Sequence, residues 1–99
     1  MHIISRKLLR EYCRKHADAC ESLDDWYKTA QQASWTNLIE VQKVYPQAES
    51  VGNFTIFNIK GNNYRLIVSI NYTKQIIYIK YVLTHAEYDK TYWKKDPYF

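Results

Sequence analysis

Alternation of apolar and polar residues dominates the stretch from Phe54 to Lys90. Two consecutive runs, YRLIVSINY and QIIYIKYVL, place apolar residues at every second position, and a shorter apolar run, FTIFNI, precedes them. A period of two is typical of strands that bury one face. The short segments between the runs, KGNN and TK, have the composition of turns. The pattern therefore predicts three consecutive antiparallel strands.

The turn between the last two runs determines which residues share a face. If Thr73 and Lys74 form a two-residue hairpin turn, the apolar positions of both strands fall on one side, which needs helices to cover it. The expected cross-strand pairs are Arg65 with Val82, Ile67 with Lys80, and Ser69 with Tyr78. The other face then carries cations, hydroxyls and an amide but no carboxylate, namely Arg65, Ser69, Asn71, Tyr78, Lys80 and Thr84. This composition favours a polyanionic ligand.

The N-terminal half shows helical periodicity. A short strand over Met1–Ile4 is expected, with Ser5 as the N-cap of a basic helix. An acidic helix over 18–33 and a short third helix over 34–45, ended by Pro46, follow. The opposite charges of the first two helices predict a helical hairpin with cross-helix ion pairs. Residues 47–53 are expected to be a loop without evident chemistry. The spacing of Thr84 and Glu87 predicts a capped short helix directly after the last strand.

Composition and charge indicate the class of binding partner without changing this outline. The chain has 99 residues, 46% hydrophobic and 24% charged, which predicts one globular domain over 1–99. The net charge of +4 is uneven, because lysine and arginine are in excess at both ends and acids in the middle. This distribution is expected if the first helix and the C-terminal hairpin face nucleic acid. No segment resembles a signal peptide or a membrane span, so a cytoplasmic location is expected.

Several kinds of site lack their sequence signature. Cys13 and Cys20 match neither zinc-binding nor disulfide spacing, and they are expected to be small buried hydrophobic residues. The three histidines are widely separated, which argues against a metal site. No G-x-S-x-G elbow occurs, and the two glycines, Gly52 and Gly61, form no phosphate-binding loop. Neither a metal nor another cofactor is expected.

The remaining polar residues suit RNA cleavage without a metal. Such cleavage requires deprotonation of a ribose 2′-OH, stabilisation of charge on the phosphate and protonation of the 5′-oxygen that leaves. Histidine titrates near neutrality, arginine is a forked phosphate ligand, and tyrosine can stack on a base and share in proton transfer. The residues available for these roles are Arg65, Lys80, His85 and Tyr88, with Lys60 and Lys90 nearby.

Ordinary structural roles for the same residues stay open. His85, at the start of a helix, can be a polar surface residue, and Tyr88 can simply cover the end of the sheet. Arg65 can pair with a neighbouring acid, either Glu87 or Asp89. The lysines that can form a solvated charge run are Lys90, Lys94 and Lys95.

The segment over residues 58–90 resembles the C-terminal half of HigB-type toxins of the RelE superfamily. The matching motifs are N-x-x-G-N-x-Y-R-L-I from Asn58, Y-I-K-Y-V in the last strand, and T-H-x-E-Y-D-K ending at Lys90. H-I-I-S near the N-terminus and L-x-x-V-x-x-V-Y-P-x-A ending at Ala48 extend the likeness over nearly the whole chain. HigB-type toxins are small ribosome-dependent mRNA endonucleases, encoded with a helix-turn-helix antitoxin, HigA.

The resemblance implies an α+β, RelE-like fold. N-terminal helices would back one face of a small, mainly antiparallel sheet, and the open face would hold the active site. Arg65 would bind phosphate, and His85 and Tyr88 would serve in proton transfer and base stacking. The residues that would bind the RNA backbone are Lys60, Lys80 and Lys90, with Lys94 and Lys95 in the tail. The implied partners are mRNA, the ribosome and a HigA-like antitoxin. Operator DNA would be bound only through the antitoxin.

Two other classes of protein compete with this interpretation. A non-catalytic basic module that binds RNA or the ribosome would use the same face, with tyrosine rings as stacking platforms. A relative with the toxin fold that has lost activity would survive as an interaction partner. The presence of Arg65, His85 and Tyr88 argues against the second of these.

Overall fold

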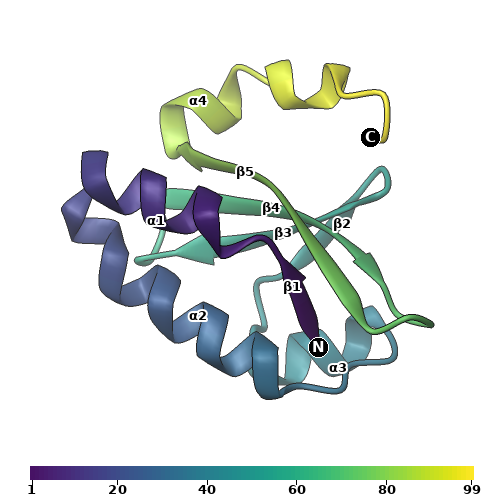
Figure 1. The fold of residues 1–99 in the computed structure, drawn as a ribbon. Coiled ribbons are helices and arrows are strands. Elements are labelled where there is room, and N and C mark those ends of the chain that lie inside the picture. Colours follow the sequence, from purple (N-terminus) through teal and green to yellow (C-terminus); the bar gives the residue numbers. More distant parts are fainter.

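A five-stranded sheet lies at the centre of the protein, which a computed structural model describes over residues 1–99 (Figure 1). The strand order is β1-β5-β4-β3-β2, and only β1 runs parallel to its neighbour, β5. The strands are β1 (His2–Ile4), β2 (Glu49–Val51), β3 (Phe54–Ile59), β4 (Tyr64–Asn71) and β5 (Ile76–Thr84). The α+β class and the mainly antiparallel sheet are as predicted.

Helices from the N-terminal half cover one face of this sheet (Figure 1). They are α1 (Arg6–Lys15), the 3₁₀ turn η1 (Ala17–Ala19), α2 (Cys20–Gln32) and α3 (Leu38–Val44). The predicted cross-helix pairing is present, with an Arg6 nitrogen 3.7 Å from an Asp24 oxygen. We call the covered side the helix face. Its core consists of residues such as Leu9, Leu23, Trp26, Val41, Phe57, Leu66, Val68, Ile77 and Val82.

Two details of the helical half differ from expectation or refine it. The third helix is shorter than predicted, because the Asn37 side chain accepts a hydrogen bond from the main-chain nitrogen of Glu40 at 3.0 Å and so caps it. Cys13 and Cys20 are free and only half-buried. Burial and the neighbouring Cys20 thiol raise the pKa of the Cys13 thiol to about 12, so this cysteine stays protonated. No helix combines the length and apolar composition that crossing a membrane requires.

The hairpin of β4 and β5 contains a bulge that the sequence pattern does not reveal. From the turn as far as the Val68–Ile79 pair, the register is the predicted one. Further along, Ile67 pairs with Tyr81 instead of Lys80. Lys80 is therefore the extra residue of a β-bulge, where two residues of one strand oppose one of the other. The predicted Ile67–Lys80 pair is wrong.

The bulge exchanges the two faces of β5 beyond Lys80. Arg65 lies opposite Leu83 and not, as predicted, opposite Val82. Val82 belongs to the core under the helices, whereas Tyr81 and Leu83 pack on the other side of the sheet. Regular alternation had placed these three residues the other way round. The inserted residue thus lets an apolar valine complete the helix face.

The C-terminal tail, residues 85–99, crosses the second face of the sheet (Figure 1). It contains α4 (His85–Asp89) and the 3₁₀ turn η2 (Tyr92–Lys95). Trp93 is buried against a small second core of Phe54, Ile56 and Ile67, so we call this side the tail face. The Asp96 carboxylate accepts a hydrogen bond from the Tyr81 hydroxyl at 2.7 Å. The face that the resemblance implied to be open is therefore covered in its middle.

Candidate active site

The short helix α4 begins where β5 ends and carries two of the predicted catalytic residues. The predicted capping box is present: Thr84 nitrogen donates to Glu87 Oε1 at 2.9 Å, and Glu87 nitrogen donates to Thr84 Oγ1 at 3.2 Å. The main-chain nitrogen of His85 also donates to the carbonyl oxygen of Asn63 at 3.1 Å. These bonds fix α4 against the β3–β4 turn and place Tyr88 over the tail face.

Arg65 projects from β4 onto the tail face, and main-chain carbonyls hold its guanidinium. Nη1 donates to the oxygens of Asn62 at 3.0 Å and Tyr64 at 3.2 Å. Neither neighbouring acid pairs with it, because Glu87 caps α4 and Asp89 lies beside His85. The other N–H groups of the guanidinium point to no partner in the protein and remain able to bind an anion.

Tyr88 joins Arg65 to the small second core. Its ring centroid lies 5.4 Å from the guanidinium carbon of Arg65, a cation–π contact, and the ring stacks on Trp93 with centroids 5.1 Å apart. Its hydroxyl donates to Glu49 Oε1 at 3.3 Å. Burial first, and then the Glu49 carboxylate, raise the pKa of Tyr88, against the opposing effect of Arg65. The phenol therefore stays protonated at neutral pH and acts as a hydrogen-bond donor.

Glu49 is a site residue that sequence reasoning missed. Residues 47–53 were expected to be a loop, which is wrong, because Glu49–Val51 forms the edge strand β2. Glu49 pairs with Ile56, a tail-face residue, so its carboxylate reaches Tyr88. The tail face was also expected to lack carboxylates, but Glu49 and Asp96 both lie there. A strand of three residues is too short to give a periodic signal.

His85 lies close to this group but does not contact it. Its side chain is exposed, and Nε2 is 3.4 Å from Asp89 Oδ2 on the same helix. The structure thus brings Arg65 and Tyr88 together and leaves the His85 imidazole beside Asp89. Because His85 and Tyr88 are three residues apart on a helix, their side chains are neighbours on its surface. A ligand bound at Tyr88 would be within reach of the imidazole.

The five lysines predicted to bind RNA fall into two groups. Lys60 and Lys80 have acidic partners, with Nζ 3.3 Å from Asp18 Oδ2 and 3.5 Å from Asp96 Oδ2, respectively. The other three are exposed and form no ion pair with the protein. They are Lys90 at the end of α4, Lys94 above the Trp93 ring and Lys95 above the Tyr92 ring. Of the five predicted lysines, the three without an acidic partner therefore all lie on the tail.

The arrangement groups the components of acid–base chemistry around one anion-binding position. A guanidinium, a protonated phenol and a carboxylate meet at Arg65, Tyr88 and Glu49. The tail that carries Tyr88 also carries the His85 imidazole and three ammonium groups without an acidic partner. Arginine can hold a phosphate, while phenol and carboxylate can give and take a proton. No group of three or more His, Cys, Asp or Glu side chains is placed to hold a metal ion.

Comparison with known proteins gives the chain a family. A model of the HigB toxin family, described as the RelE-like toxic component of a toxin-antitoxin system, matches residues 19–91. The chain is 28% identical over 93 residues to an mRNA interferase HigB of Escherichia coli O6:H1, which covers 91% of this chain and 90% of that protein. It is 26% identical over 92 residues to the mRNA interferase toxin HigB of Escherichia coli K12, covering 90% and 88%. A protein of Shigella flexneri with the name mRNA interferase HigB matches equally well.

Proposed function

The chain belongs to the HigB family of RelE-like toxins, and from this premise we propose that it cleaves messenger RNA on the translating ribosome by attack of a ribose 2′-OH on the adjacent phosphate. The chain is an endoribonuclease toxin with an antitoxin partner, as its family membership and its mRNA interferase relatives indicate. The observation that carries the proposed mechanism is the meeting of Arg65, Tyr88 and Glu49 on the tail face.

Arg65 is the residue proposed to bind the scissile phosphate. Negative charge grows on the non-bridging oxygens as the 2′-oxygen attacks. The guanidinium, already held by the Asn62 and Tyr64 carbonyls, stabilises that charge without reorganising. Its planar donors match two phosphate oxygens at once, which the point charge of a lysine does not.

Glu49 and Tyr88 divide the proton transfers in the proposed reaction. The Glu49 carboxylate accepts the 2′-OH proton while the bond from the 2′-oxygen to phosphorus forms. The bond from phosphorus to the 5′-oxygen breaks, and Tyr88 gives its proton to that oxygen. The raised pKa of Tyr88 keeps it in the protonated form that this role requires. The products are a 2′,3′-cyclic phosphate and a 5′-hydroxyl. His85, one helical turn before Tyr88, stays a second candidate for proton transfer.

The tail lysines are proposed to hold the RNA backbone outside the reacting centre. Lys90, Lys94 and Lys95 are exposed and unpaired, so they are available to phosphates of mRNA or of the ribosome. Lys60 and Lys80 would first have to exchange Asp18 and Asp96 for a phosphate. We propose a HigA-like helix-turn-helix protein as the antitoxin, through which operator DNA would be bound.

Induced expression without the antitoxin tests this function. Growth should stop and translated messages should be cut, whereas an Arg65→Ala variant at equal soluble level should leave growth normal. Primer extension on one abundant message locates the cuts. Normal growth with confirmed soluble protein, or arrest by both forms alike, would favour the non-catalytic RNA- or ribosome-binding module instead.

A further inference from the structure

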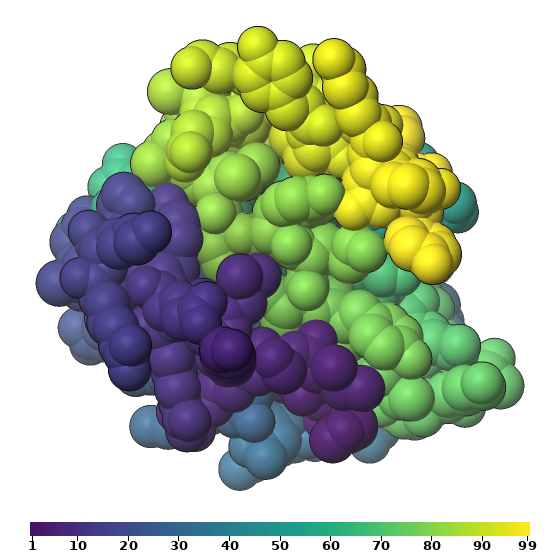
Figure 2. Space-filling model, turned by 45° about the horizontal axis from the view of Figure 1, so that its top comes forward, coloured from purple at the N-terminus to yellow at the C-terminus, as the bar shows by residue number.

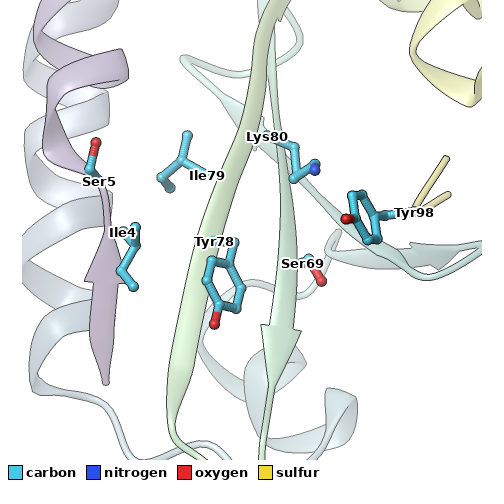
Figure 3. A pocket seen from close by; sticks show the side chains of 7 residues that line it. All are labelled: Ile4, Ser5, Ser69, Tyr78, Ile79, Lys80 and Tyr98. Atoms are coloured by element: carbon cyan, nitrogen blue, oxygen red, sulfur yellow. The ribbon is translucent and has the colours of Figure 1, made fainter. Parts of the chain in front are cut away.

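A groove of about 570 Å³ lies on β5, between the N-terminal segment and the end of the C-terminal tail. Figure 2 shows β5 exposed at this position, with residues near the N-terminus on one side and the tail on the other. The lining residues are Ile4, Ser5, Ser69, Tyr78, Ile79, Lys80 and Tyr98 (Figure 3). The volume is within the range of sites for small molecules, about 300–1,000 Å³. Neither the group of Arg65, Tyr88 and Glu49 nor His85 lines it.

The lining combines flat apolar surfaces with polar groups that the protein does not use. Figure 3 shows Tyr78 and Tyr98 on either side of Ser69, with Ile79 and Ile4 toward the other wall. Both rings are exposed, 40% for Tyr78 and 73% for Tyr98. The hydroxyls of Ser69, Tyr78 and Tyr98 take part in no hydrogen bond within the protein. A nucleobase has apolar faces and a polar edge, which match stacking rings and free hydroxyls.

The charge of the groove favours a nucleobase over a phosphate as its ligand. Its single cation, Lys80, pairs with Asp96 at 3.5 Å, and its Nζ lies 4.8 Å from the centroid of the Tyr98 ring. The ammonium is thus already neutralised and serves to hold Tyr98 in position. A phosphate would find little net positive charge here. A neutral aromatic ligand does not need a free positive charge in order to bind here.

The part of the groove that Ser69 and Tyr78 line is on the same face as the candidate active site, whereas Ile79 belongs to the helix face. Ser69 follows Arg65 by four residues on β4, a separation of roughly 13 Å along a strand. Ile67, which lies between them on this face, belongs to the small core with Trp93. An RNA strand of a few nucleotides held at Arg65 can therefore pass the edge of the tail and reach the groove.

We propose that this groove binds one unstacked nucleobase of the RNA, at a distance of a few nucleotides from the scissile phosphate. The inference rests on the proposed function for the identity of the ligand as RNA. The base stacks against Tyr98 and Tyr78, and Ser69 contributes a hydrogen bond to its edge. This site helps to select where the message is cut, because it binds a nucleotide other than those that react.

Nuclear magnetic resonance of the free protein tests the site without requiring catalysis. Adenosine 5′-monophosphate, and a tetranucleotide whose 2′-hydroxyls are methylated to prevent cleavage, are added to isotope-labelled protein. The amide signals of Ser69, Tyr78 and Ile79 should shift. Tyr98→Ala should weaken binding by roughly 5- to 150-fold, the range for losing one stacking partner. Tyr92→Ala is the matched control, since Tyr92 is a tail tyrosine of similar exposure that does not line the groove, and it should bind as wild type.

The outcomes separate this inference from the proposed function. Shifts confined to the surroundings of Arg65 and Tyr88 would overturn the groove site and leave the nuclease intact. Shifts at the groove in a protein that fails to arrest growth would support the site and contradict the proposed function. If Tyr98→Ala weakened binding of the antitoxin but not of the RNA, the groove would belong to the protein partner and the inference would be wrong.

Discussion

The guanidinium carbon of Arg65 lies 5.4 Å from the ring centroid of Tyr88, joining the middle of the sheet to the helix that follows its last strand. The contact places a permanent cation beside a phenol whose pKa burial and Glu49 raise. Before reaction the phenol keeps its proton. Once the proton has gone to the leaving oxygen, Arg65 stabilises the phenolate as well as the phosphate. The same cation thus supports two steps of the proposed cleavage.

Loss of either the Tyr88 hydroxyl or the Glu49 charge should slow cleavage, even when the tyrosine ring is kept. Tyr88→Phe keeps the stack on Trp93 and the contact with Arg65, yet it should slow cleavage by about 10²–10⁴-fold because the proton donor is gone. Glu49→Gln preserves a hydrogen-bond acceptor and should cost a comparable factor. Single-turnover cleavage measures both effects, with Tyr92→Phe as the control. A Tyr88→Phe protein that cuts at the wild-type rate would reduce Tyr88 to a stacking residue.

The raised pKa of Tyr88 also has a consequence for the pH profile. The phenol should be half-ionised only at a pH above its ordinary pKa of about 10, because the folded protein raises that pKa. Between about pH 7 and pH 9, ionisation of Tyr88 should therefore cause no decline in the cleavage rate. Any decline in that range should also occur in Tyr88→Phe. A wild-type decline in that range that disappears in the variant would show that Tyr88 ionises earlier than its surroundings indicate.

The hydrogen bond between Tyr81 and Asp96 makes anchoring of the tail dependent on pH. The Tyr81 hydroxyl, the Tyr98 main-chain nitrogen and Lys80 lower the pKa of Asp96 in the folded protein. The stability that this carboxylate contributes is thus present above the ordinary value of about 3.9 and is lost as the pH falls through the lowered folded value. Urea unfolding of wild type and Asp96→Asn should differ at pH 7 and converge in acid. A difference that persists to about pH 2 would contradict this origin.

Two single-residue deletions in β5 test the bulge. Without Lys80, regular alternation leaves Ile79 on the helix face and Tyr81 on the tail face, where both lie now. This variant should fold and lose only the ion pair between Lys80 and Asp96. Deletion of Ile79 instead turns Lys80 into the core under the helices, where an unpaired charge costs several kcal/mol. Urea unfolding compares them, and equal stability of the two variants would mean that the bulge is elsewhere.

The parts of the fold that could be predicted are those fixed by local chemistry. The capping box of Thr84 and Glu87 requires only two residues three apart, and it is present as predicted. The Ser69–Tyr78 pair follows from the adjacent turn. Lys80, however, is a residue that either regular alternation or a bulge accommodates. The bulge is favoured because it turns Val82 into the core, and that core forms only when the helices pack on the sheet.

The residues of the candidate site could likewise be predicted only where local chemistry identifies them. Arg65 and Tyr88 were identifiable from residue type and motif, and they meet in the structure. Glu49 was not, because its strand has three residues and its place beside Tyr88 depends on pairing with β3. The covering of the tail face was missed for a similar reason. Burial of Trp93 joins it to Phe54 and Ile67, which are distant in the sequence.

Cleavage of a translated message by Arg65 variants tests the central claim most directly. Wild type, Arg65→Ala and Arg65→Lys are compared by primer extension, with ribosome or RNA binding measured in parallel and folding checked by circular dichroism. Arg65→Ala should slow cleavage by about 10²–10³-fold with binding nearly intact, and Arg65→Lys should restore little of the loss. The products should end in a 2′,3′-cyclic phosphate or the 3′-phosphate derived from it. Folded Arg65→Ala protein that cuts at the wild-type rate, or that loses cleavage only in proportion to binding, would contradict the account.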